Sequence, residues 1–211
     1  MGQKVNPIGL RLGIHQEHKS IWYLPKELYR KALAQDIQIR EMLYKKLRNA
    51  GVGDVYIERS QNSIKITIHV MRPGIVIGRG GSGLEMLKRE IEKLIKSETA
   101  TAQQRIELKV EPIKEPNLNA KLVAENISDQ LARRIPHRRV MKQTIDRVMN
   151  SGAKGVRIVL SGRIGGAEIG RVEKLHAGKV SLSTVRENID YAQIPSLTKS
   201  GYVGVKVWIN K

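Results

Sequence analysis

The chain has 211 residues, with 38 Lys and Arg against 20 Asp and Glu, and a formal net charge of +18. It contains no cysteine, which excludes disulfides, thiolate metal sites and a cysteine nucleophile. No apolar run approaches the ~18 residues of a membrane span, and a hydrophobic content of 40% is typical of a globular protein with one or two domains.

Residues 1–20 are predicted to form a basic arm that folds onto a partner. Lys4, Arg11 and Lys19 lie there among turn-forming Asn, Pro and Gly residues, without a periodic apolar pattern. The segment lacks the apolar core of a signal peptide, so we expect a cytosolic protein.

Residues 21–112 are predicted to form a first α+β domain. Its patterns indicate, in order, a helix over residues 26–50, strands at 55–57 and 64–70, a Gly-rich loop, a helix over about 83–97 and a strand at 106–110. Pro112 and Pro116 then break the chain, which predicts a linker over residues 113–118.

Residues 119–211 are predicted to form a second domain of two helices on a small antiparallel sheet. Asn119 can cap the first helix, Pro136 ends it, and a second helix is expected from about His137 to Asn150. Strand patterns follow at residues 156–160 and 203–209, with two shorter pieces near 167–176 and 179–183. The predicted fold class is therefore α+β.

The Gly-rich loop contains Gly78-Arg79-Gly80-Gly81, the Gly-x-x-Gly spacing with which KH domains clamp a nucleotide backbone. Gly78, Gly80 and Gly83 also spell a dinucleotide-binding fingerprint, which requires a buried strand directly before the first glycine. Only three apolar residues follow Gly74 there, so a nucleotide-binding enzyme is the weaker alternative.

Basic residues also gather around Pro136, and they are Arg133, Arg134, Arg138, Arg139 and Lys142. Arg138 and Lys142 share a helix face because they are four residues apart. Positive charge is unfavourable near a helix N-terminus, so Arg138 and Arg139 favour an external polyanion over a solvated helix end. Arg163 lies in a Gly-rich segment at 161–168, for which a structural hairpin and a functional role are equally good interpretations.

Lys and Arg outnumber Asp and Glu in both halves of the chain, which predicts contact with an acidic polymer over much of its length. A basic surface that is merely solvated is the weaker interpretation. The aromatic residues are only six Tyr and two Trp. We therefore expect contacts with the backbone and helix shape of a nucleic acid, rather than base stacking on exposed rings.

No catalytic site, metal site or cofactor is predicted. The five histidines show no metal-ligand spacing with a carboxylate, and no nucleophile motif is present. No small-molecule substrate and no membrane contact are expected.

Five segments together resemble the family of bacterial-type small ribosomal subunit protein three, in the family's order and over nearly the whole chain. They are residues 2–13, 73–78, 161–168, 189–191 and 204–209. The resemblance implies a type II KH domain followed by an α+β domain, in the head of the small ribosomal subunit of the cytoplasm or of an organelle. The implied partners are ribosomal RNA, mRNA and the neighbouring head proteins ten, fourteen and two.

The resemblance also implies roles for individual residues. Arg138, Arg139 and Lys142 match the family's residues that are thought to contact incoming mRNA at the entry channel and to help separate its secondary structure. The family's Gly-x-x-Gly loop matches Gly78 to Gly81, with Arg79 as its cation. Further candidates for ribosomal RNA contacts are Lys4, Arg11, Arg133, Arg134 and Arg163. A free-standing KH regulator of RNA is the remaining alternative, and co-sedimentation with small subunits would separate the two.

Overall fold

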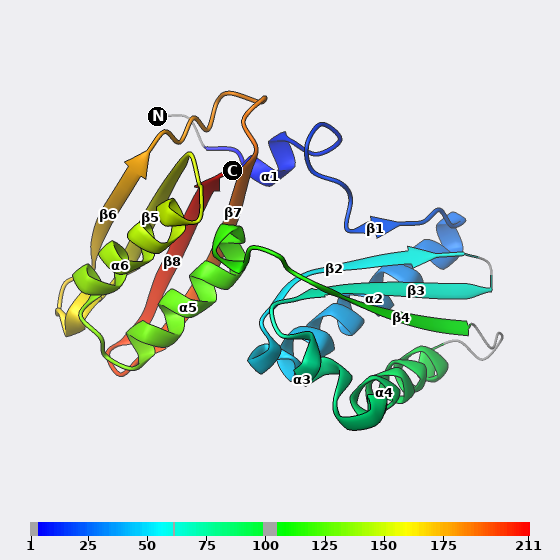
Figure 1. Cartoon of the computed structure of the whole chain (residues 1–211). Coiled ribbons are helices and arrows are strands. Elements are labelled where there is room, and N and C mark those ends of the chain that lie inside the picture. The colour runs from blue at the N-terminus through cyan, green and yellow to red at the C-terminus, as the bar shows by residue number, and fades with distance from the viewer. Residues whose placement is uncertain (1–3, 61, 99–104) are drawn as a thin grey trace. The chain divides into compact units, whose positions relative to one another are not determined.

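The computed structural model describes residues 4–60, 62–98 and 105–211, which form two compact units (Figure 1). The N-terminal unit comprises His18–Lys114. The C-terminal unit comprises Glu115–Lys211 together with the described residues up to Glu17, so the N-terminal segment belongs to the unit that is distant in sequence.

The N-terminal unit is a four-stranded sheet with three helices. In chain order its elements are β1 (Ser20–Ile21), α2 (Lys26–Lys46), β2 (Val52–Arg59), β3 (Ser63–Val70), α3 (Pro73–Ile77), α4 (Ser82–Glu98) and β4 (Arg105–Pro112). The sheet order is β1-β2-β3-β4, with β2 and β3 antiparallel and β3 and β4 parallel. The predicted order of helix, two strands, glycine loop, helix and strand is present, and α3 is an additional helix directly before the loop.

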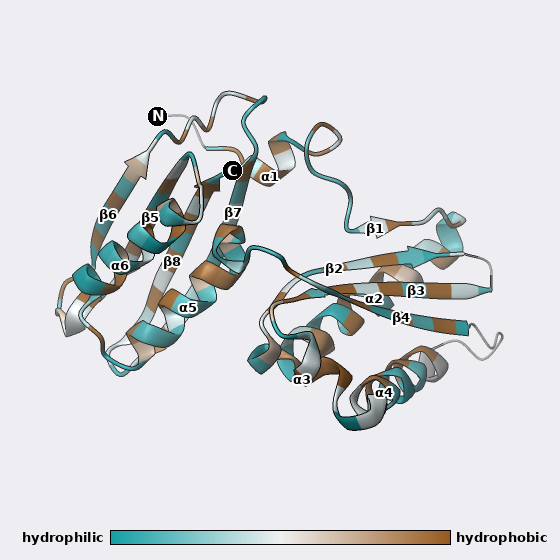
Figure 2. Ribbon diagram, in the orientation of Figure 1, coloured by the Kyte–Doolittle hydropathy of each residue, from teal (hydrophilic) through white to brown (hydrophobic). Residues whose placement is uncertain are grey.

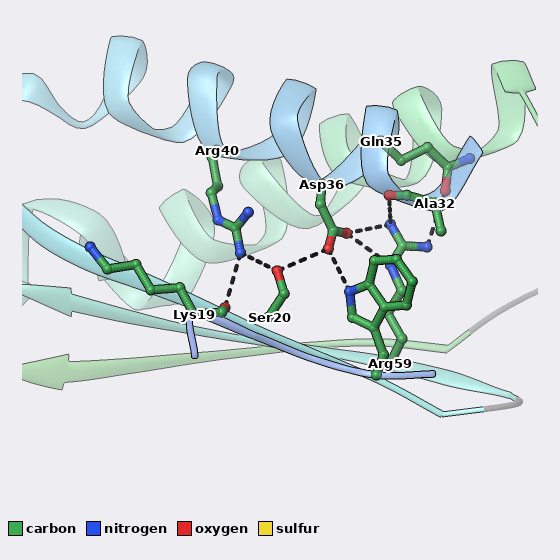
Figure 3. A network of polar contacts seen from close by, with 8 residues as sticks. Lys19, Ser20, Ala32, Gln35, Asp36, Arg40 and Arg59 are labelled. Atoms are coloured by element: carbon green, nitrogen blue, oxygen red, sulfur yellow. Dashed lines mark hydrogen bonds and ion pairs between the residues drawn. The ribbon is translucent and has the colours of Figure 1, made fainter. Parts of the chain in front are cut away.

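The core of this unit lies between one face of the sheet and the helices α2 and α4, which lie on the same side of it (Figure 3). Ile57, Ile66 and Leu108 are neighbours across three strands, and the first two are fully buried. Leu43 of α2 and Ile91 of α4 are also fully buried. The alternation of apolar and polar residues along β3 puts its isoleucines on this face, because successive strand side chains point to opposite sides.

A buried polar network joins α2 to β1 and β2 (Figure 3). The carboxylate of Asp36 is inaccessible to solvent and accepts hydrogen bonds from Arg59 Nε at 2.8 Å and from Trp22 Nε1 at 2.8 Å. Arg59 also donates to the side chain of Gln35, and Ser20 donates to Asp36. The ion pair is stabilising only because these bonds replace the hydration that both charges lose.

The C-terminal unit places two helices on one face of an antiparallel sheet (Figure 1). Its elements are α1 (Pro7–Leu10), α5 (Ala120–Ala132), α6 (His137–Asn150), β5 (Gly155–Gly162), β6 (Arg171–Gly178), β7 (Ile189–Thr198) and β8 (Gly201–Asn210). The sheet order is β6-β5-β8-β7. Hydrophobic residues interleave with hydrophilic ones along its strands (Figure 2), and the apolar side chains of β5 and β8 that pack against the helices are fully or nearly fully buried.

One strand differs from the sequence prediction. The piece expected near residues 179–183 is irregular, and β7 at Ile189–Thr198 supplies the fourth strand instead. β7 contains Pro195, which breaks the usual strand signal. It is tolerated because β7 lies at an edge of the sheet.

The N-terminal segment, which was expected to fold onto a partner, contacts the C-terminal unit of its own chain. The side chain of Arg11 is fully buried and donates hydrogen bonds to four backbone carbonyls within 3.1 Å, those of Pro7, Leu182, Thr184 and Glu187. The segment is thus fastened to the chain's own β6–β7 connection.

Candidate nucleic-acid interface

The glycine loop is a tight turn between two helices. α3 ends at Ile77, and Gly78, Gly80 and Gly81 follow with φ values of 71°, 61° and 82°. This left-handed region is readily accessible only to glycine. The segment before Gly78 is a helix rather than a buried strand, so the dinucleotide-binding alternative is wrong.

The glycines of this loop serve two different purposes. A Cβ atom on Gly83 would lie 2.5 Å from the carbonyl oxygen of Val76, and one on Gly78 would lie 3.0 Å from the backbone nitrogen of Gly83. These two glycines therefore allow α3 and α4 to pack closely. A Cβ atom on Gly80 or Gly81 would meet no heavy atom within 4 Å, so these two positions are open to a ligand.

Exposed side chains around the loop combine one cation with apolar groups. Arg79 is exposed. Ile75, Ile77 and Met86 are 51%, 38% and 62% exposed. Backbone amides at the start of α4 and the cation of Arg79 suit a phosphate, and the apolar side chains suit nucleobases.

The second candidate surface is the outer face of α6. Val140, Met141, Thr144, Ile145 and Val148 are buried on its inner face, which leaves Arg138, Arg139 and Lys142 exposed. No ion pair holds any of these three cations within the described parts of the chain. The first turn of α6 has no acidic residue and no side-chain cap, so nothing in that turn neutralises them.

The start of α6 is held in place by the sheet. His137 Nε2 lies 2.8 Å from a carboxylate oxygen of Glu173 on β6, and Arg171 Nε lies 3.3 Å from the other oxygen. The Glu173 carboxylate is therefore paired with His137 and Arg171. Its contact with His137 fixes the start of α6, from which Arg138 and Arg139 project.

A cavity of about 230 Å³ brings together basic residues that are distant in sequence. Arg134 comes from the turn between α5 and α6, Arg163 from the segment after β5, and Lys199 from the β7–β8 turn. Leu131, Ile135, Pro136, Ile164 and Val203 supply apolar lining. Arg134 and Arg163 were predicted as candidates, whereas Lys199 was not, because only the pairing of β7 with β8 brings it here.

Two of the remaining predicted residues, Lys4 and Arg133, are exposed. Arg11 is different, because its guanidinium is buried and fully used by backbone carbonyls. It is therefore a structural residue, and the expectation that it contacts RNA does not hold in this structure.

The described residues contain neither a candidate metal cluster nor a candidate membrane-spanning helix. No cluster of three or more His, Cys, Asp and Glu side chains there could hold a metal ion. None of the helices in this part of the chain has the length and hydrophobicity to cross a membrane.

Comparison with known proteins gives matches over both units. The KH domain model matches residues 38–118, and the model described as ribosomal protein S3, C-terminal domain, matches residues 127–209. The predicted α+β fold, with a KH domain followed by two helices on an antiparallel sheet, is confirmed.

Curated relatives align along the full chain. Small ribosomal subunit protein uS3 of Hahella chejuensis is 47% identical over 211 residues, which is 100% of this chain and 90% of the relative. The protein of the same name from Desulforamulus reducens is also 47% identical, over 100% of this chain and 92% of the relative. That from Desulforudis audaxviator is 47% identical over 99% of this chain and 93% of its own length.

Proposed function

Because the chain belongs to the family of small ribosomal subunit protein uS3, we propose that it is an RNA-binding structural constituent of the small ribosomal subunit and functions in translation. The family is one of ribosomal proteins rather than of enzymes. Ribosomal RNA is the proposed principal partner in ribosomes of the cytoplasm, with head proteins ten, fourteen and two as neighbours.

We further propose that α6 contacts incoming mRNA at the entry channel. The observation that carries this proposal is the row of exposed, unpaired cations Arg138, Arg139 and Lys142 on a helix whose other face is buried. The cations bind phosphates and release counterions. If they meet ~3 phosphates of a single strand, they contribute about −2 to the slope of log affinity against log salt.

The contribution of α6 to strand separation is passive. The rigid, basic helix binds the phosphates of an mRNA strand that has already separated from its complement. Because this strand is held after the ribosome has advanced, its re-pairing with the complementary strand is disfavoured. The Gly78–Gly81 loop is proposed to hold RNA backbone in the N-terminal unit. Support comes from the open space above Gly80 and Gly81 and from the exposed Arg79.

Translation through structured mRNA tests this proposal. Ribosomes carrying Arg138→Ala with Lys142→Ala should assemble normally and should slow at a stable hairpin, but not on an unstructured message. Arg147→Ala is the matched control, because Arg147 is an exposed cation in the last turn of the same helix. Unchanged passage of the double variant through the hairpin would refute the role of α6. Co-sedimentation of the tagged chain with small subunits through moderate salt tests the wider proposal.

A further inference from the structure

The C-terminal sheet has a second face that α5 and α6 leave uncovered (Figure 1). Two strand residues show which side chains of the sheet point toward α5 and α6, because each contacts one of these helices. Asp190 accepts a hydrogen bond from the backbone of Ala120 at the start of α5, and Glu173 pairs with His137 of α6. The neighbours of these residues along β7 and β6, Tyr191 and Lys174, therefore point to the opposite face.

Three side chains form a continuous row across this helix-free face. Tyr191 of β7 is in register with Trp208 of β8, and Trp208 is in register with Arg157 of β5. The rings of Tyr191 and Trp208 have centroids 5.1 Å apart and planes tilted by 35°. The guanidinium carbon of Arg157 lies 5.5 Å from the centroid of the Trp208 ring. All three side chains are half-buried, so the row presents part of its surface to solvent.

The rest of the face is basic and carries another aromatic ring. Lys206 lies two residues before Trp208 on β8, about 7 Å along the strand, and pairs in register with Gln193. Tyr202, further along β8 on the same face, is 69% exposed. Lys174 and His176 of β6 complete the set, in register with Val159 and Arg157.

No acidic residue lies on this face within the four strands. The strand residues that point away from α5 and α6 are basic, aromatic, apolar or uncharged polar residues. The acidic strand residues Glu173 and Asp190 lie on the helix side. The one carboxylate recorded against this face is Glu187 of the β6–β7 connection, which accepts a hydrogen bond from Asn210 Nδ2 at 3.0 Å. The cations of the four strands outnumber it, and such an excess favours a polyanion as the partner.

The outer face of the other sheet shows what an ordinary solvated face looks like in this protein. There, Lys65 pairs with Glu58 and Lys109 lies 2.6 Å from Glu111. The hydrogen bond and the charge of Lys109 lower the pKa of Glu111 below its ordinary value. Lysines on that face are held in ion pairs with strand carboxylates, whereas no ion pair holds Arg157, Lys174 or Lys206 within the described residues.

We propose that the helix-free face of the C-terminal sheet, centred on Tyr191, Trp208 and Arg157, binds single-stranded RNA by stacking unpaired bases on this row, with Lys206 and Lys174 on the phosphates. Aromatic rings and Arg guanidinium planes are the groups on which splayed bases stack, and a sheet displays them side by side. This surface is separate from the Gly78–Gly81 loop and from the outer face of α6. It goes beyond the proposed function by adding contact with bases to contact with backbone.

The test uses the emission of Trp208 in the whole chain. A Trp208→Phe chain reports Trp22 alone, and subtraction isolates the Trp208 signal. A short single-stranded RNA oligonucleotide should quench Trp208, whereas an abasic strand of equal length and charge should not. Trp208→Leu should weaken binding of the base-containing strand about tenfold, the typical effect of losing one stacked base. Tyr23→Leu is the matched control, because Tyr23 is 95% exposed in the other unit, and it should change affinity less than twofold.

The outcomes separate this proposal from the role of α6. Quenching of Trp208 that persists in the Arg138→Ala, Lys142→Ala chain supports a distinct surface, even if that variant translates normally. Equal affinity of Trp208→Leu and native chains for the base-containing strand overturns the proposal. Binding of the base-containing strand without quenching of Trp208 would also overturn the proposal. That result would indicate that the helix-free face contacts a neighbouring protein instead. The comparison of the base-containing and abasic strands requires only the native chain and the conservative Trp208→Phe chain, which keeps an aromatic ring at this position.

Discussion

Arg134 is predicted to be strained for the sake of function, and replacing it should raise stability while lowering RNA affinity. α5 ends in a motif in which the backbone N–H of Arg134 donates to Leu131 at 2.9 Å and that of Ile135 donates to Gln130 at 3.2 Å. This pair of bonds requires a left-handed residue after the helix, which is usually glycine. Here Arg134 has φ of 62°, and it is the one non-glycine residue with positive φ in the described parts of the chain.

Two opposing contributions determine how Arg134→Gly changes the free energy of unfolding. A side chain in the left-handed region costs roughly 1–2 kcal/mol. Glycine relieves that strain but loses about 0.5–1 kcal/mol more conformational entropy on folding. Arg134→Gly should therefore increase the free energy of unfolding of the C-terminal unit by ~0.5–1 kcal/mol, which raises its melting temperature by about 2–4 °C.

Calorimetry and salt-dependent RNA binding measure the two effects separately. Arg134→Ala is the matched control, because it removes the same charge and keeps the Cβ strain. It should leave stability unchanged within ~0.5 kcal/mol. Both variants should lower the magnitude of the salt slope by about 0.7–1, which corresponds to one lost phosphate contact. The reasoning is refuted if Arg134→Gly is no more stable than Arg134→Ala, or if neither variant weakens RNA binding.

Three further predictions concern stability, each measured by chemical denaturation. Asp36→Asn should destabilise the N-terminal unit by about 3–5 kcal/mol, because it leaves Arg59 charged and buried. Glu58, which is half-buried and pairs with Lys65, is the control. Its change to Gln should cost less than ~1 kcal/mol, and similar losses for both substitutions would contradict a special role for the buried pair. Arg11→Ala should destabilise the C-terminal unit by at least ~3 kcal/mol, since four carbonyl groups lose a charged donor, and a loss below ~1 kcal/mol would show that the segment is loosely attached. Gly83→Ala should cost about 1–3 kcal/mol, because the added methyl group meets the Val76 carbonyl oxygen 2.5 Å away. Gly74→Ala in open space within α3 should instead stabilise by ~0.5 kcal/mol, and equal effects of the two substitutions would disprove the packing argument.

The local elements were the most predictable part of the fold. Leu87, Ile91 and Ile95 of α4 repeat at helical spacing, and all three are buried. Asn119 accepts from the backbone of Lys121 and Leu122, as expected of a helix cap. Such features depend on residues a few positions apart, so periodicity and capping residues reveal them directly.

Features that depend on distant segments were missed. β7 carries Pro195 and a weak alternation, and it becomes a strand because β8 supplies its hydrogen-bonding partner. Arg11 resembled any other cation of a basic segment, and only the carbonyl groups of residues 182–187 explain its burial. Lys199 joins Arg134 and Arg163 because three segments, the α5–α6 turn, the segment after β5 and the β7–β8 turn, line one cavity.

The sequence alone determined the class of this protein. Its charge, its glycine loop and the order of its apolar patterns predicted an α+β protein that binds a nucleic acid, because composition and short-range periodicity can be interpreted without knowledge of any tertiary contact. Only the tertiary structure decided which cations are available and what lies beside them. It buried Arg11, exposed the outer face of α6, and aligned Tyr191, Trp208 and Arg157 from three strands. The physical reason is that burial and neutralisation of a charge depend on groups brought together by strand pairing and helix packing, often more than a hundred residues apart, as for Arg11 and Glu187.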